Sequence, residues 1–219
     1  MKILDTPRSG SQGMTTASRN RSGQYLRQRA MPTQPRTAAQ INARSRLTSQ
    51  AAAWRGLTDN QRAAWQAFAA SFTVNNSLGT TINLTGAQCF VKVNTTNLLI
   101  GDATVTTPPA LPAFAAALTT GLTLTAGTPA VKIAGSGTLT GVKYMMFASP
   151  QLSAGVSYCG SFRYLATFTN FTTGFMDLTT AYSAKFGAPI VGKKIFVKVV
   201  QSQLGMQDNG TLYAGIVQT

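Results

Sequence analysis

Three zones with different apolar patterns follow one another along the chain. The first shows no sustained period, the second repeats apolar residues at helical spacing, and the third alternates apolar with polar residues as strands do. The pattern therefore predicts an α+β protein with four parts. They are a basic N-terminal arm (1–36), a helical region (37–103), a Pro-rich linker (104–117) and a β-sandwich (118–219).

The helical region is expected to hold three helices, at about 37–55, 59–72 and 86–100. A Thr-x-x-Gln box precedes the third, as it does the second. In the first helix, apolar residues recur at intervals of four, four and three and define one face: Ala43, Leu47, Ala51 and Trp54. The third contains several β-branched residues, so a strand over Cys89–Val93 is the alternative there.

A sharp corner joins the first two helices. A glycine is suited to end the first, and Thr58 followed three residues later by Gln61 predicts a capping box that starts the second. Trp54 and Trp65 then lie close to the corner, and we expect them to anchor one small core together with Phe68. Stacking of the tryptophans on nucleic acid is the alternative.

The third zone predicts strands. Val142, Tyr144 and Met146 share one face, and about seven such runs follow one another with regularly placed turns. This arrangement is typical of an immunoglobulin- or fibronectin type III-like sandwich. Asn209-Gly210 predicts a hairpin turn, and residues 177–186 predict a short helical connection across the ends of the sandwich.

The basic arm has little apolar material. Thr15 to Ala30 suggests a β-hairpin whose turn is Arg21-Ser22-Gly23. Because an isolated ribbon is marginal in water, a solvated flexible tail is the alternative for the free chain.

The ionisable side chains restrict the chemistry. The chain has no histidine and no glutamate, and its five acidic residues are aspartates far apart in sequence. Ser-His-Asp, Cys-His and histidine–metal sites are thereby excluded within one chain, since each needs a histidine. We expect no enzyme, no cofactor and no metal ion, although a carboxylate-only or lysine-based site stays open.

Positive charge is concentrated at the front. The net charge is +14; through Arg62 the chain holds ten arginines and one lysine against two aspartates, and the remainder holds one arginine and seven lysines against three. Because arginine pairs bidentately with phosphate and carboxylate, the front predicts an acidic partner, either nucleic acid or an acidic protein surface. The candidate contacts are Arg19, Arg21, Arg27, Arg29, Arg36, Arg44 and Arg46.

Two further features bear on the compartment. Cys89 and Cys159 lie in different predicted parts without metal-site spacing, and we expect two buried free thiols, with a disulfide as the open alternative. No apolar run is long enough for a membrane helix, and the first residues lack the apolar core of a signal peptide. We therefore expect the protein to stay where it is made until it is assembled.

The front of the chain also has a family resemblance. Residues 17–69, ASRNRSGQYLRQRAMPTQPRTAAQINARSRLTSQAAAWRGLTDNQRAAWQAFA, resemble phage and prophage proteins in which "srnrgG-y-R-r--P-nP-T-aQ---R" leads into "aWraLtdaqraaW". The matching residues are Ser18–Asn20, Gly23, Tyr25, Arg27, Arg29, Pro32, Pro35, Thr37, Gln40, Arg44, Trp54–Thr58 and Gln61–Trp65. Leu84–Gly101 and the C-terminal region are similar to these proteins as well. The resemblance implies a virion component with other virion proteins as partners.

These observations favour a structural protein of a phage particle. We expect a minor capsid or decoration protein, anchored by its arm and helical hairpin and present in several copies. A head–tail connector or tail protein and a nucleic-acid-binding virion protein are the alternatives. A receptor- or glycan-binding sandwich is a third class, whose candidate aromatic residues are Tyr144, Tyr158, Phe171, Phe175 and Tyr213.

Overall fold

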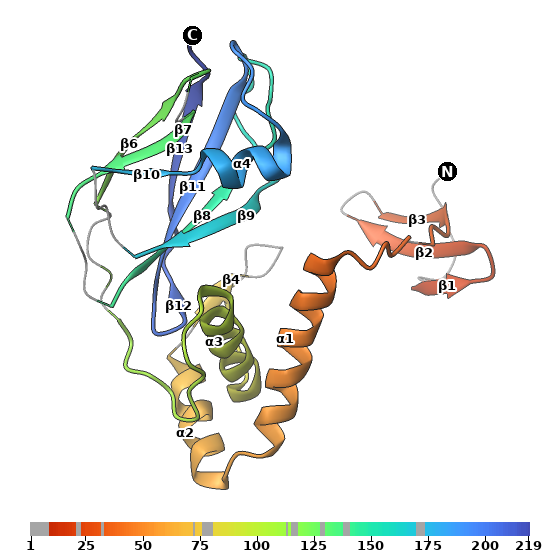
Figure 1. Cartoon of the computed structure of the whole chain (residues 1–219). Coiled ribbons are helices and arrows are strands. Elements are labelled where there is room, and N and C mark those ends of the chain that lie inside the picture. Colours follow the sequence, from red (N-terminus) through yellow and green to blue (C-terminus); the bar gives the residue numbers. More distant parts are fainter. Residues whose placement is uncertain are drawn as a thin grey trace. The chain divides into compact units, whose positions relative to one another are not determined.

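The chain forms two compact units, residues 1–43 and 44–219, and the boundary between them falls within the first helix, α1 (Ala38–Arg55). As predicted, it combines helices with antiparallel sheets (Figure 1). The computed structural model describes residues 9–20, 23–31, 33–71, 73–75, 81–112, 114, 118–127, 130–137, 141–169 and 174–219.

The first unit contains a small antiparallel sheet of order β1–β2–β3. Its strands are β1 (Gly10–Gln12), β2 (Thr15–Asn20) and β3 (Gly23–Gln28). β2 and β3 form the predicted hairpin, with Thr15 opposite Gln28. The predicted turn residues Arg21 and Ser22 lie outside the described residues. β1 was not predicted, because its Gly-Ser-Gln sequence carries no strand pattern.

This sheet has no core. None of the described residues of the first unit is buried, and β1 is exposed at every position. Its strands are held by backbone hydrogen bonds along the ladder and by little apolar burial. A sheet of three short strands without a covered face is marginally stable by itself.

The three helices lie at their predicted positions. They are α1, α2 (Asp59–Ala70) and α3 (Gly86–Ile100), so the strand alternative for residues 89–93 is wrong. Thr58 and Thr85 each close a complete capping box with the glutamine three residues later. α3 ends at Gly101, whose φ of 77° favours glycine. The predicted end of the second helix, Phe72, lies outside the described residues.

The apolar face predicted for α1 is not the face that is buried. Gln50 is the buried residue of α1, whereas Leu47 is 55% exposed and Ala43 and Ala51 are exposed too. The physical reason is that α1 packs on the other helices near its C-terminal end, where the Trp54 ring lies 5.6 Å from that of Phe90.

Two short strands that were not expected lie between α2 and α3. β4 (Thr73–Asn75) and β5 (Thr81–Asn83) pair antiparallel. Three-residue strands rich in Thr and Asn give no usable period, which is why the pattern missed them.

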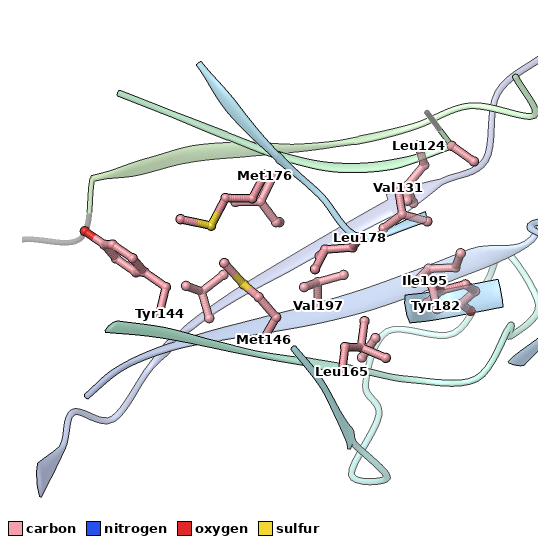
Figure 2. Close-up of a cluster of buried hydrophobic side chains, with 14 of the residues drawn as sticks. Leu124, Val131, Tyr144, Met146, Leu165, Met176, Leu178, Tyr182, Ile195 and Val197 are labelled. Carbon is pink, nitrogen blue, oxygen red and sulfur yellow. The ribbon is translucent and has the colours of Figure 1, made fainter. Parts of the chain in front are cut away.

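The remainder of the second unit is a sandwich of two antiparallel sheets. One has the order β10–β7–β6, and the other has the order β12–β11–β8–β9, with β13 also paired to β11. The strands are β6 (Thr119–Leu124), β7 (Val131–Gly135), β8 (Lys143–Ala148), β9 (Arg163–Phe168), β10 (Phe175–Asp177), β11 (Lys194–Gln203), β12 (Met206–Gln207) and β13 (Thr211–Ile216). Figure 2 shows Met176 pointing toward Tyr144 and Met146 in the layer between the sheets.

The predicted connection at residues 177–186 is the helix α4 (Thr179–Phe186). It belongs to the core, since Leu178 and Tyr182 are fully buried and the Tyr182 hydroxyl donates to the Ser149 carbonyl at 3.2 Å. Burial raises the pKa of Tyr182. The Asp177 carboxylate accepts the backbone N–H of Thr179, a hydrogen bond typical of aspartates at turns.

The tight turn after β11 lies at Leu204–Gly205, so the turn predicted at Asn209-Gly210 is misplaced. The strands before and after the predicted turn, β11 and β13, do pair antiparallel. Both turn residues have positive φ, 53° and 76°, as a type I′ hairpin turn requires. A Cβ on Gly205 would stand 2.5 Å from the Val93 carbonyl oxygen of α3. The turn is thus packed on a distant helix, a contact that no local turn motif encodes.

The Pro-rich linker is fixed to the helices. The Trp65 indole N–H donates to the Thr106 carbonyl at 2.8 Å, and the Asn94 side-chain amide bonds both the N–H and the carbonyl of Val105. Residues 104–112 contain no helix or strand, yet these bonds hold the segment against α2 and α3.

Candidate interaction surface

The arginines predicted to bind a partner lie on both units. Arg19 is on β2, Arg27 on β3, and Arg29 and Arg36 follow in the connection to α1; all four are exposed. Arg44 and Arg46 lie on α1 in the second unit, the first exposed and the second half-buried. Arg21 lies outside the described residues.

The arm sheet presents arginine on both of its faces. Ala17 pairs with Leu26 and Thr16 with Arg27. Because side chains alternate along a strand, Arg19 shares one face with Leu26, while Arg27 lies on the other. The sheet can therefore contact an acidic partner from either side.

The arginines predicted to bind a partner, from Arg19 to Arg46, have no acidic residue near them in sequence. Residues 6–58 hold nine arginines and no acidic residue. In the described part of the chain, Arg19, Arg27 and Arg36 form no ion pair. Two of the chain's five aspartates are ion-paired with other side chains: Asp59 with Arg62 at 3.2 Å and Asp102 with Lys143 at 2.6 Å.

Exposed apolar side chains lie between the arginines. The front of the chain exposes five large ones, which are Met14, Leu26, Met31, Ile41 and Leu47. Sequence reasoning did not identify them as contact residues. The available signal was the lack of alternation or helical period through residues 1–36, since isolated apolar residues in such a zone have no core to enter.

The predicted structural anchors lie together in the helical cluster. Trp65 is fully buried, with its ring 5.5 Å from both Phe68 and Phe90. Phe90 also contacts Trp54, so it is the residue between the two tryptophans. The Trp65 ring is therefore not accessible for stacking on nucleic acid.

The Thr58–Gln61 box holds the corner between α1 and α2. The backbone N–H of Gln61 donates to the Thr58 hydroxyl oxygen at 3.3 Å, and the backbone N–H of Thr58 donates to the side-chain amide oxygen Oε1 of Gln61 at 2.9 Å. In addition, the Arg62 guanidinium donates to the Arg55 carbonyl at 2.7 Å, which satisfies an oxygen in the last turn of α1.

The aromatic residues considered for glycan binding do not gather in one place. Tyr144 is fully buried in the sandwich core and Tyr213 packs against that core, with its hydroxyl 2.6 Å from Thr119 Oγ1. Tyr158 is 76% exposed on a separate loop, and Phe171 lies outside the described residues. Tyr144 is thereby removed from the candidates.

Cys89 and Cys159 are buried free thiols, as expected. Burial raises the pKa of the Cys89 thiol and lowers that of the Lys92 ammonium one turn later. Among the residues that the structure describes, no three Cys or Asp side chains gather as a metal site would require. No helix in the described ranges is long and apolar enough to span a membrane.

Comparison with known proteins adds no assignment: no protein-family model, no curated protein and no solved structure matches the chain. The functional argument therefore rests on the residues and contacts of this chain, together with the resemblance of residues 17–69 described above.

Proposed function

We propose that the chain is a non-enzymatic structural component of a bacteriophage virion. It is a minor capsid or decoration protein, present in several copies, that binds other virion proteins through its arginine-rich arm and helical hairpin. One observation carries the proposal: residues 9–53 form three strands and most of a helix, yet Gln50 is the buried residue among those described.

Ordering such a segment without burial is costly. Fixing each residue's backbone costs about 1–2 kcal/mol, and exposed strands and helices recover little of it through apolar burial. A partner that covers the arm would bury its exposed apolar side chains and pair with its arginines, and both contacts would offset the cost of ordering. A protein that functions as a free monomer does not need a partner to cover part of its chain.

The β-sandwich supplies the stable body of the protein. We take it to be of the immunoglobulin or fibronectin type III kind, because short antiparallel strands in two sheets enclose its core. In the assembled particle this body forms the decorating part and the arm forms the anchor. A head–tail connector or tail protein would use the same two parts at a different place in the virion.

Nucleic acid is the second candidate partner, on the strength of nine arginines without an acid in residues 6–58. Binding to phosphates predicts an affinity that falls steeply with salt, with a slope set by the number of phosphates neutralised. The exposed apolar residues between the arginines favour a protein partner instead, since phosphates leave them uncovered.

The test is incorporation into particles. Wild-type chain should co-purify with virions, and the triple variant R19E/R27E/R29E should lose about tenfold or more of its occupancy, because charge reversal opposes an acidic surface. The control K132E/K194E/K198E reverses the same number of charges on the sandwich and should retain incorporation. Absence of the wild-type chain from purified particles would refute the proposal. Arm-dependent binding to bare DNA with a steep salt slope would favour nucleic acid.

A further inference from the structure

The edge strand β13 of the sandwich has an open side. The Val217 N–H donates to the Lys193 carbonyl at 2.9 Å, so the odd-numbered residues of β13 bond to β11 and the even-numbered ones direct their backbone groups the other way. No hydrogen bond reaches these outward groups of Leu212 or Ala214 from any residue that the structure describes. The strand can therefore accept another strand along this side.

β6 closes this side only beyond the end of β13. The Gln218 N–H donates to the Leu124 carbonyl at 3.1 Å, and the Ala126 N–H donates to the Gln218 carbonyl at 2.8 Å. The Ile216 carbonyl accepts the side-chain amide of Gln218 at 3.2 Å, and an oxygen of this kind has room for a second bond. The open stretch is thus about as long as β13 itself.

β13 also exposes apolar side chains on the outer face of its sheet. Leu212 is 48% exposed and Ile216 is 39% exposed, and Ala214 between them is exposed as well. Residues 209–219 contain no charged side chain. Natural sheets avoid an uncharged apolar edge of this kind unless it is covered, because such an edge pairs readily with another chain.

The other edges of the sandwich are protected in the ways that natural sheets use. β10 and β12 are three and two residues long. β6 has a bulge between Thr119 and Gly121, and β9 begins with Arg163 and has its Tyr164 carbonyl bonded by the Lys185 side chain of α4. β13 has six residues and contains no bulge, no charge and no proline, which indicates an edge that is used for pairing.

The strand is complementary to a second copy of itself. In an antiparallel pair centred on Ala214, Leu212 of each copy lies opposite Ile216 of the other, so apolar side chains meet along the outer face. The outward backbone groups of these residues then bond to each other in register. The first residue of the added strand lies opposite Val217, one position before the closure by β6.

The charges near the edge allow this pair. The lysines next to it on the outer face are Lys194 and Lys198 of β11, which lie opposite Ile216 and Leu212. Across the pair, a lysine of one copy is three strand spacings, or about 14 Å, from a lysine of the other. This separation exceeds the Debye length of about 8–10 Å at moderate salt, so the repulsion is largely screened.

We propose that β13 pairs antiparallel with β13 of a second copy, so that the two sheets become continuous across a two-fold axis at Ala214. Leu212 and Ile216 of the two copies then cover each other. The contact goes beyond the proposed function, because it joins the chain to itself and needs no other virion protein.

Cysteine cross-linking of the purified full-length chain tests the pair. Residues directly opposite in a hydrogen-bonded antiparallel pair have Cα atoms about 5.5 Å apart, which a disulfide can span. Under mild oxidation, Ala214→Cys should form a covalent dimer about tenfold or more faster than Thr123→Cys, an exposed position on β6. Both variants keep the buried Cys89 and Cys159, and the wild-type chain gives the background from these two thiols.

Sedimentation velocity measures the same contact without an added thiol. The wild-type chain should dimerise as its concentration rises, and Ala214→Lys should weaken the dimer by about tenfold or more, because two lysines would face each other at the axis. Thr123→Lys adds the same charge on β6 and should dimerise like the wild type. Melting temperatures show that both variants are folded, and the cross-linking result decides if Ala214→Lys is not.

Salt separates this contact from binding of the arginine-rich arm to a second copy. Higher ionic strength should strengthen the β13 pair, because each chain has a net charge of +14 and screening weakens the repulsion between copies. Arginines that bind an exposed carboxylate of the other copy, such as Asp59 or Asp177, would instead give a dimer that salt weakens.

Linking at position 214 that is no faster than at position 123 would overturn the inference. A wild-type chain that stays monomeric, a dimer that Ala214→Lys leaves unchanged while folded, or a dimer that salt weakens would do the same, and would leave β13 to a strand of another protein. The virion role fails separately, since it depends on whether the chain is present in purified particles.

Discussion

Residues 9–53 and the sandwich both contain regular secondary structure, but different forces hold it in the two regions. The arm sheet and most of α1 rely on backbone hydrogen bonds, with Gln50 as the buried side chain among the described residues. The sandwich adds a layer of fully buried side chains that includes Ile133, Tyr144 and Val197. Burying one such side chain contributes about 1.5–3 kcal/mol. Secondary structure therefore forms in both regions, whereas most of the stability comes from the sandwich.

Hydrogen exchange should give the largest contrast between the two regions. Central amides of β11 should exchange only through global unfolding, with protection on the order of 5 kcal/mol or more, whereas those of β2 and β3 should be close to unprotected. Native-state exchange read by NMR or mass spectrometry measures both at once. Strong protection of β2 and β3 in the free protein would mean that the arm needs no partner.

Removing a buried side chain and removing an exposed one from the helical hairpin should have very different effects on the free energy of unfolding. Trp65→Ala removes the fully buried anchor of the α2–α3 cluster and its bond to Thr106, and should cost about 3–5 kcal/mol. Leu47→Ala on α1 should change stability by less than about 0.5 kcal/mol, since Leu47 is exposed. Urea unfolding of both variants gives the two values. A large cost for Leu47→Ala would show that α1 is packed in solution.

The turn at Gly205 tests whether the helical cluster and the sandwich share their stability. Gly205→Ala places a Cβ against Val93 of α3 and should cost about 2–3 kcal/mol, more than the strain of positive φ alone. Gly192→Ala is the matched control, because Gly192 also has positive φ but no neighbour within 4 Å of the added atom, and it should cost about 1 kcal/mol. Equal melting temperatures for the two variants would contradict the close packing of the turn on α3.

The smallest expected effect concerns the corner of the helical hairpin. Thr58→Ala removes the N-cap of α2 and should cost about 1 kcal/mol. Thr48→Ala, an exposed change within α1, should be neutral or slightly stabilising because alanine is the better helix former. Thermal unfolding by circular dichroism resolves the two. If Thr58→Ala is neutral, the capping box does not hold the corner.

The sequence was enough to predict the elements that are determined by neighbouring residues. The helices and both capping boxes follow from spacing and from Thr-x-x-Gln motifs, and the two faces of β8 follow from alternation. The turn at Leu204–Gly205 and the position of Phe90 between the tryptophans depend on contacts between residues distant in sequence. The burial of Gln50 in place of Leu47 depends likewise on where the neighbouring helices end, which a periodicity cannot encode.

The candidate surface likewise contains residues that the sequence identified and residues that it did not. Composition was enough to identify the arginines, because a run without acids is visible in the sequence. The exposed apolar residues among them were not recognised, since Leu47 belongs to a face that looks like core and Leu26 to a plausible strand. Their exposure, 52% for Leu26 and 55% for Leu47, becomes visible only in the structure.

The turn at Gly205 has a mechanical consequence for an anchored protein. A pull on the end of α1 reaches α3 through Trp54 and Phe90, and α3 is packed on the turn that ends β11. β11 is bonded to β8 on one side and to β12 and β13 on the other. If α1 anchors the protein as proposed, tension therefore enters the sandwich at the end of β11, a strand that is paired along both of its sides.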